Sequence, residues 1–121
     1  MAINKVLVVE DSPAELANIK GIISEAGFPV IGATNGKEAV ALAKSEKPDL
    51  IFLDVIMPEM DGFAACRELN NDSATKNIPV IFVTSKGQKA DRMWAEMQGA
   101  KAYITKPYQP EEIIDQLKMF Q

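Results

Sequence analysis

The stretch LIFLDVIMP, residues 50–58, carries the strongest indication of the fold. Its first four residues are large and apolar, and a carboxylate, Asp54, follows them directly. An unbroken apolar run is typical of a parallel strand that is covered on both faces. Ligands of open α/β sheets bind beyond the carboxyl ends of such strands. Asp54 is therefore predicted to lie at a binding or reaction site.

Three further apolar runs also end in polar residues. Residues 6–9 precede Glu10 and Asp11, residues 80–83 precede Thr84 and Ser85, and residues 102–105 precede Lys106. If these runs are parallel strands, their polar ends meet at one edge of the sheet. Oxygen ligands suit Mg²⁺, and a lysine can neutralise a transferring phosphoryl group. The sequence thus predicts a cation and oxyanion site at this edge.

Segments with helical spacing alternate with the strands. We expect helices at about 13–26, 36–46, 62–69, 88–98 and 110–120, and a weaker strand at 28–32 whose Pro29 favours an edge position. Ser12 and Glu15 match a capping box at the start of the first helix. This alternation predicts a flavodoxin-like (βα)5 α/β fold with a doubly wound, parallel five-stranded sheet. Of the plausible strand orders, 2-1-3-4-5 is favoured because it places Glu10 and Asp11 beside Asp54.

The bulk composition narrows the possible functions. The 121 residues fit one domain, 1–121, with no output domain. A net charge of −4 argues against nucleic acid as a partner, and short apolar runs argue against membrane insertion. We therefore expect a cytoplasmic protein. The chain has no histidine, which excludes Ser-His-Asp and Cys-His catalysis and histidine-containing metal sites.

The acidic cluster itself indicates a reaction. Three neighbouring carboxylates repel one another unless a cation lies among them, and Mg²⁺ uses one or two carboxylates together with phosphate oxygens. A carboxylate can attack phosphorus, and Asp54 stands alone at the central strand end. Lys106 and Thr84 are expected to contact the phosphoryl group, and the Ile56 carbonyl to reach the metal. The bond between Lys106 and Pro107 is a candidate for the cis isomer.

With these motifs in place, the sequence resembles the response-regulator receiver family, whose familiar single-domain members are CheY-like. The resemblance covers the whole chain. It rests on Glu10-Asp11-Ser12, on residues 54–62 (DVIMPEMDG), on Thr84-Ser85 and on Lys106-Pro107, all in family order and spacing. Within the family, residues 83–100 look like the PilH-type regulators of type IV pilus twitching motility.

The resemblance implies a role for each matched residue. Glu10, Asp11, Asp54 and the Ile56 carbonyl would hold Mg²⁺, Asp54 would be phosphorylated, Thr84 and Lys106 would bind the phosphoryl group, and Thr84 and Tyr103 would form the switch. The phosphate donor would be a histidine kinase of CheA-like type. The switch would change the surface of the fourth helix, fifth strand and fifth helix for a downstream motor or signalling protein, or the chain would act as a phosphate sink. A monomer or weak dimer is expected.

Two other classes of function remain open from the residues. An aspartyl-phosphate phosphatase of the haloacid dehalogenase type needs an acid two residues after its nucleophile, where this chain has Ile56. A flavodoxin-like cofactor binder would meet repulsion between flavin phosphate and Glu10-Asp11. We therefore expect a phosphoacceptor switch rather than a turnover enzyme. Because an apolar Ile56 cannot orient an attacking water, autodephosphorylation should be slow.

Overall fold

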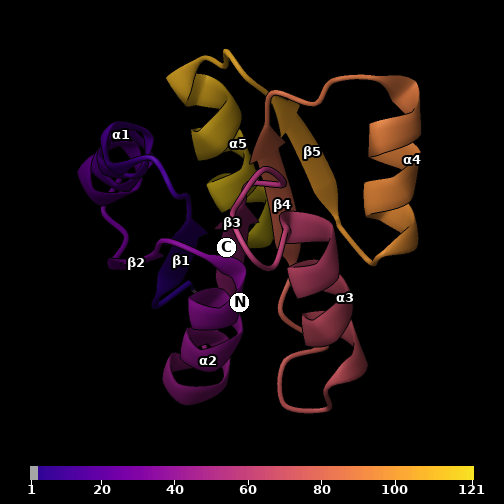
Figure 1. Cartoon of the computed structure of the whole chain (residues 1–121). Helices are drawn as coiled ribbons and strands as arrows, with labels where there is room; N and C mark the ends of the chain where they lie inside the picture. Colours follow the sequence, from indigo (N-terminus) through magenta and orange to yellow (C-terminus); the bar gives the residue numbers. More distant parts are fainter. Residues whose placement is uncertain (1–2) are drawn as a thin grey trace.

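The structure, a computed structural model that describes residues 3–121, contains five strand and helix units in strict alternation (Figure 1). The strands are β1 (Val6–Val9), β2 (Val30–Ala33), β3 (Leu50–Leu53), β4 (Val80–Thr84) and β5 (Ala102–Thr105). The helices are α1 (Pro13–Glu25), α2 (Gly36–Glu46), α3 (Gly62–Asn71), α4 (Lys89–Met97) and α5 (Pro110–Phe120). The elements predicted from the sequence are confirmed within a few residues at each end.

The five strands form one parallel sheet in the order β2-β1-β3-β4-β5, as predicted. The strand that contains the weaker pattern, β2, lies at the edge. At the switch point, Val9 of β1 pairs with Leu53 of β3. Glu10 and Asp54, the residues that follow this pair, therefore leave the sheet side by side.

Helices cover both faces of the sheet (Figure 1). On one face α1 and α5 pack against Leu50 and Phe52 of β3. On the other face α2, α3 and α4 pack against Ile51 and Leu53. All four β3 residues are buried, which explains why this strand is apolar without interruption.

The helix ends follow most of the predicted signals. Asp61 caps α3 by accepting a hydrogen bond from the Ala64 N–H at 2.8 Å, and Gly27, with φ of 95°, follows the end of α1. The capping box predicted at α1 forms only in half. Ser12 Oγ accepts from the Glu15 N–H at 3.4 Å, but the Ser12 N–H donates to Glu10 instead of to Glu15. The carboxylate of Glu15 points to a different partner, described below.

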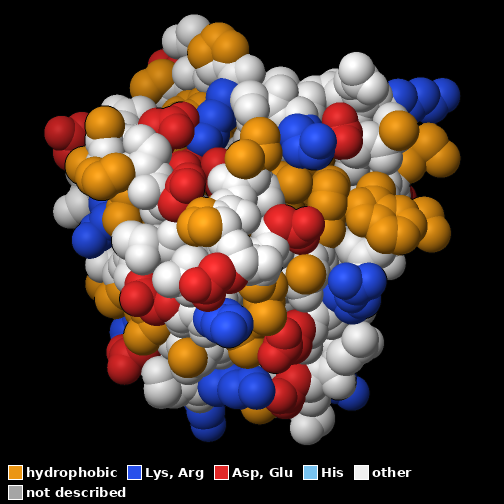
Figure 2. Space-filling model, viewed as in Figure 1, with side chains coloured by type: hydrophobic (Ala, Val, Ile, Leu, Met, Phe, Trp, Pro, Cys, Tyr) orange, Lys and Arg blue, Asp and Glu red, His pale blue; other side chains and the backbone are white. Residues whose placement is uncertain are grey.

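An aromatic series crosses the α3 and α4 side of the sheet. Trp94 lies edge-on to Phe63 with ring centroids 6.5 Å apart, Phe63 contacts Phe82 at 5.5 Å, and Phe82 contacts Tyr103 at 5.9 Å. Trp94 itself is 44% exposed, so it both packs and faces solvent. Figure 2 shows apolar side chains gathered over α4, where Met93 and Met97 are also exposed. No helix among residues 3–121 is long and apolar enough to cross a membrane.

Candidate functional site

Three carboxylates meet at the switch point of the sheet. Glu10 and Asp11 follow β1, Asp54 follows β3, and one oxygen from each lies within 4.8 Å of the others. Glu10 is 1% exposed and Asp54 5% exposed, whereas Asp11 faces solvent. Parallel pairing of β1 with β3 produces this arrangement, because it brings both strand ends to the same edge. The sequence prediction of an acidic cluster at this edge agrees with the structure.

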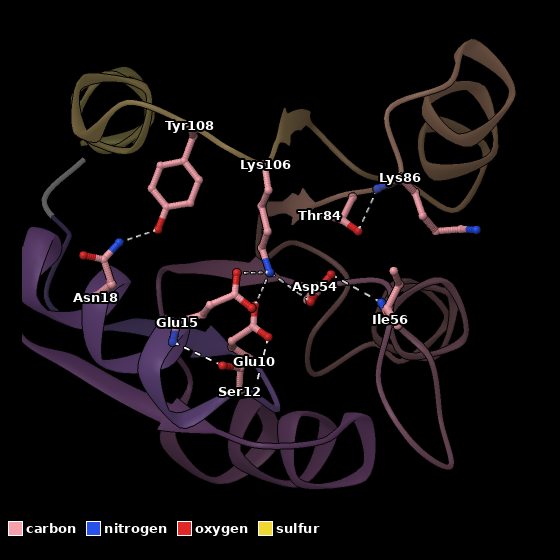
Figure 3. Close-up of polar contacts among 10 residues, drawn as sticks. All are labelled: Glu10, Ser12, Glu15, Asn18, Asp54, Ile56, Thr84, Lys86, Lys106 and Tyr108. Carbon is pink, nitrogen blue, oxygen red and sulfur yellow. Dashed lines mark hydrogen bonds and ion pairs between the residues drawn. The ribbon is translucent and has the colours of Figure 1, made fainter.

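Lys106 reaches the cluster from the end of β5 (Figure 3). Its Nζ lies 2.7 Å from Glu10 Oε2, 2.9 Å from Glu15 Oε1 and 3.2 Å from Asp54 Oδ2. The peptide bond between Lys106 and Pro107 is cis, as the sequence suggested. One ammonium group thus joins a residue of α1 to residues from two strand ends.

Burial and charge shift the pKa values of this cluster. Burial raises the pKa of Glu10 to about 7, although the hydrogen bond from Lys106 opposes the shift. Burial of Lys106 disfavours its charged form, but hydrogen bonds to Glu10 and Glu15 and the charge of Asp54 outweigh burial and raise the pKa of Lys106. Lys106 is therefore a firmly charged ammonium at neutral pH. A protonated lysine is what a site for phosphoryl oxygens needs.

The loop after β3 holds Asp54 in place. The Ile56 N–H donates to Asp54 Oδ1 at 3.3 Å, and the Gly62 N–H donates to the Val55 carbonyl at 2.9 Å. A Cβ atom on Gly62 would lie 2.1 Å from the Asp54 carbonyl oxygen, so only glycine permits this contact. The Ile56 side chain is 53% exposed at the edge of the site.

Thr84 and Tyr103 lie on the β4 and β5 side of the cluster. Thr84 is fully buried, and its Oγ1 accepts a hydrogen bond from the Lys86 N–H at 3.4 Å (Figure 3). The Tyr103 hydroxyl donates to the Lys86 carbonyl, and the Arg92 guanidinium lies 5.1 Å from the centroid of the Tyr103 ring. Thr84 and Tyr103 are therefore both hydrogen-bonded to the backbone of Lys86, Thr84 to its N–H and Tyr103 to its carbonyl.

A pocket of about 810 Å³ opens over the acidic cluster. Its lining comprises Glu10, Asp11, Ala14, Glu15, Asn18, Asp54, Ile56, Ser85, Lys106, Pro107 and Tyr108. Sequence reasoning missed Glu15, Asn18 and Tyr108 as members of the site. The capping pattern already accounted for Glu15, but its position in the first turn of the helix that begins shortly after Glu10 and Asp11 was a signal that it lies near the same edge. Tyr108 reaches the pocket through a hydrogen bond from Asn18 Nδ2 at 3.0 Å, which the sequence does not indicate.

The donor set fits a hard divalent cation. All candidate side-chain ligands are carboxylate oxygens, and they converge at one point beside an open pocket. The same pocket carries one ammonium group that faces the nucleophile candidate Asp54. Such a combination binds phosphate groups and a metal together.

The fold and the site together define a doubly wound α/β protein of the CheY-like type, with an acidic cluster at its switch point. Residues 6–118 match the family described as the response regulator receiver domain. The chain therefore belongs to the response-regulator receiver family, whose members are phosphoacceptor switches, as its motifs predicted.

Individual relatives refine this assignment. The chain is 43% identical to Protein PilH of Pseudomonas aeruginosa over 110 residues, which is 91% of each protein, so the resemblance to PilH is confirmed. It is also 36% identical to the DNA-binding dual master transcriptional regulator RpaA of Synechocystis, over 94% of this chain but only 47% of RpaA.

Solved structures agree with the fold. Chemotaxis protein CheY4 of Vibrio cholerae superposes with a TM-score of 0.92 at 30% identity, covering 99% of this chain and 100% of CheY4. The receiver domain of a sensor histidine kinase from Pseudomonas aeruginosa superposes with a TM-score of 0.90 at 28% identity, over 98% of each chain. In that structure a magnesium ion is coordinated in the active site cleft.

Proposed function

We propose that this protein is a response regulator that accepts a phosphoryl group on Asp54 from a histidine kinase. The observation that carries the proposal is the position of the Lys106 ammonium, 3.2 Å from Asp54 and beside two further carboxylates that suit a metal. Glu10, Asp11, Asp54 and the Ile56 carbonyl are the proposed Mg²⁺ ligands. The magnesium-bound relative supports this cofactor.

The proposed transfer needs few catalytic groups. An Asp54 carboxylate oxygen forms a bond to phosphorus while the bond between phosphorus and the donor atom breaks, and the donor atom keeps the bonding electron pair. Lys106 balances charge on one phosphoryl oxygen, and the Thr84 hydroxyl donates to another. A bound Mg²⁺ would supply charge neutralisation. Because residues 1–121 contain no histidine, the phosphohistidine must lie outside them.

The proposed output is a change on the surface of α4, β5 and α5. If the Thr84 hydroxyl turns toward a phosphoryl group, it leaves the Lys86 N–H, and the Lys86 carbonyl is the partner of Tyr103. The exposed apolar residues of α4 lie on this surface (Figure 2). We propose a cytoplasmic role in type IV pilus motility, either with a motor or signalling partner or as a phosphate sink for a CheA-like kinase, on the strength of the similarity to PilH.

Phosphorylation by acetyl phosphate with Mg²⁺, followed by mass spectrometry, tests the proposal. We expect a single phosphoryl group on the wild-type protein and none on Asp54→Asn. Asp115→Asn, on the exposed side of α5, is a control that removes the same charge and should be labelled as the wild type is. Labelling that survives in Asp54→Asn contradicts the proposal, and so does continuous release of phosphate with turnover.

A second experiment tests the choice of partner. Transfer from a phosphorylated CheA-like kinase should label this chain, and labelling should require Mg²⁺. For a phosphate sink, adding this chain should shorten the lifetime of phosphate on a sister regulator that shares the kinase. If the sister regulator keeps its phosphate equally long, the output role remains and the sink role is wrong.

A further inference from the structure

Glu15 makes a contact that its place in the sequence does not require. It is the third residue of α1, where an acid would normally bond back to the N-cap. The comparable acids Asp91 of α4 and Glu112 of α5 do so, through Gln88 N–H and Gln109 N–H. Glu15 instead extends into the pocket and pairs with Lys106 at 2.9 Å (Figure 3).

We infer that Glu15 is a positioning residue that competes with the phosphoryl group for Lys106 and thereby slows phosphorylation of Asp54. The inference rests on the proposed function, because it concerns the lysine of the same site. It assigns to Glu15 a role that its location in a helix N-terminus alone would not suggest.

The donor count of the lysine supports competition. A lysine ammonium has three N–H donors, and here three carboxylates, from Glu10, Glu15 and Asp54, surround it within 3.2 Å. A phosphoryl oxygen can gain a full hydrogen bond from Lys106 only when one of these carboxylates gives up its own. In the unphosphorylated protein, carboxylates therefore surround all three N–H donors of Lys106.

Exposure decides which carboxylate is released. The side chains of Glu10 and Asp54 are 1% and 7% exposed, and a buried carboxylate that loses its partner remains without water. The side chain of Glu15 is 47% exposed, so solvent can replace the ammonium when it leaves. Glu15 is thus the partner that Lys106 loses at the lowest cost in free energy. The strength of the ion pair between Glu15 and Lys106 therefore contributes to the activation barrier for phosphorylation of Asp54.

The surrounding structure keeps Glu15 in reach of Lys106. Asn18, one turn further along α1, donates to the Tyr108 hydroxyl at 3.0 Å. Tyr108 lies two residues after Lys106, so this hydrogen bond fixes the first turns of α1 against the segment that carries the lysine. The ion pair between Glu15 and Lys106 therefore joins two segments that the hydrogen bond between Asn18 and Tyr108 already keeps together.

The rate constant for phosphorylation by sub-saturating acetyl phosphate, measured by mass spectrometry at saturating Mg²⁺, tests the inference. We expect Glu15→Gln to react about two- to fivefold faster than wild type, the range of a half-exposed ion pair. Glu46→Gln is a matched control, because Glu46 also pairs with a lysine, Lys5, at 2.7 Å and is 41% exposed, far from the pocket. The Glu46→Gln rate should equal the wild-type rate.

A double-mutant cycle separates competition for Lys106 from a general effect of charge on an anionic donor. In a Lys106→Met background, Glu15→Gln should leave the slow residual rate unchanged. Lys106→Gln serves in the same way if Lys106→Met unfolds. Urea denaturation of the same four proteins without metal gives a second readout, in which the effects of Glu15→Gln and of the lysine substitution should be less than additive.

The outcomes are distinct. A Glu15→Gln rate equal to or below the wild-type rate overturns the inference, as does an acceleration that persists without Lys106, or strict additivity in urea. If the wild-type protein accepts phosphate on Asp54 but the Glu15→Gln experiments give one of these contrary results, the proposed function stands and only the role of Glu15 is rejected. If the wild-type protein accepts no phosphate, both are overturned.

Discussion

Substituting Gly62 with alanine should disturb both the stability of the protein and the position of Asp54. Gly62 is the first residue of α3, and its N–H donates to the Val55 carbonyl at 2.9 Å. An alanine Cβ would lie 2.1 Å from the Asp54 carbonyl oxygen and 2.7 Å from the Val55 Cα. The new methyl group would therefore meet backbone atoms, which cannot turn aside as a flexible side chain can.

The size of the effect follows from these distances. Ordinary contact begins at 3.4 Å, so the Asp54 carbonyl and the start of α3 must separate by more than 1 Å. Asp54 resists such a shift because its N–H donates to the Val9 carbonyl of β1 at 3.1 Å. We expect a loss of about 3 kcal/mol in the free energy of unfolding, at the upper end of overpacking effects. For a domain of this size that loss corresponds to a fall of roughly 10 °C in Tm.

Two assays check this expectation. Thermal unfolding followed by circular dichroism gives the stability, and the acetyl phosphate rate constant, measured well below the Tm of the variant, reports the placement of Asp54. A displacement of about 1 Å at a reacting group can cost up to about 100-fold in rate, so we expect a fall of at least tenfold.

Gly21→Ala is the matched control. Gly21 lies in α1 with no atom within 4 Å of a Cβ at that position, so alanine should stabilise the helix by about 0.5–1 kcal/mol and leave the phosphorylation rate unchanged. The reasoning is refuted if Gly62→Ala unfolds at the wild-type Tm. It is also refuted if the variant is destabilised but is phosphorylated at the wild-type rate.

Three further predictions concern single residues. Ile56→Asn should shorten the lifetime of the phosphorylated protein, because an amide at the edge of the pocket can orient an attacking water. Mass spectrometry over time gives the rate at which phosphate is lost, and a rate equal to or slower than that of the wild type would contradict this prediction. Burial raises the pKa of the Cys66 thiol from 9.0 to about 11, so the unfolded state loses its proton first as pH rises. The free energy of unfolding of the wild type should therefore fall by about 2 kcal/mol relative to that of Cys66→Ala between pH 9 and 11, and parallel urea-denaturation profiles of the two proteins would refute this expectation. Asp61→Ala should cost about 1 kcal/mol in urea denaturation through loss of the α3 cap, whereas a stability equal to wild type would show that the cap contributes nothing.

The fold was predictable because its signals are local and periodic. The run from Leu50 to Leu53 alternates between two cores in the structure, which is why neither face permits a polar residue. The strand order followed from electrostatics, since only one plausible order brings Asp54 next to the acids after β1. These inferences needed no knowledge of side-chain conformation.

The missing parts of the site depend on the directions of individual side chains. Glu15 fitted a capping box, but its carboxylate found a stronger partner in Lys106, a residue that only tertiary structure brings near. Tyr108 contacts Asn18 across 90 residues of sequence, and no spacing rule predicts such a pair. Thr84 lies at the carboxyl end of β4 as expected, yet the structure turns its hydroxyl to the Lys86 N–H.

The aromatic series from Tyr103 to Trp94 gives the protein an intrinsic optical probe. Trp94 is the chain's single tryptophan, so its fluorescence comes from one known position on α4. Trp94 packs edge-on to Phe63 and is partly exposed to water, a condition in which small displacements change emission wavelength and quenching. Movement of Tyr103 would reach this ring through three aromatic contacts, from Tyr103 to Phe82, from Phe82 to Phe63 and from Phe63 to Trp94. A displacement of Tyr103 should thus be measurable in real time by fluorescence of the unlabelled chain.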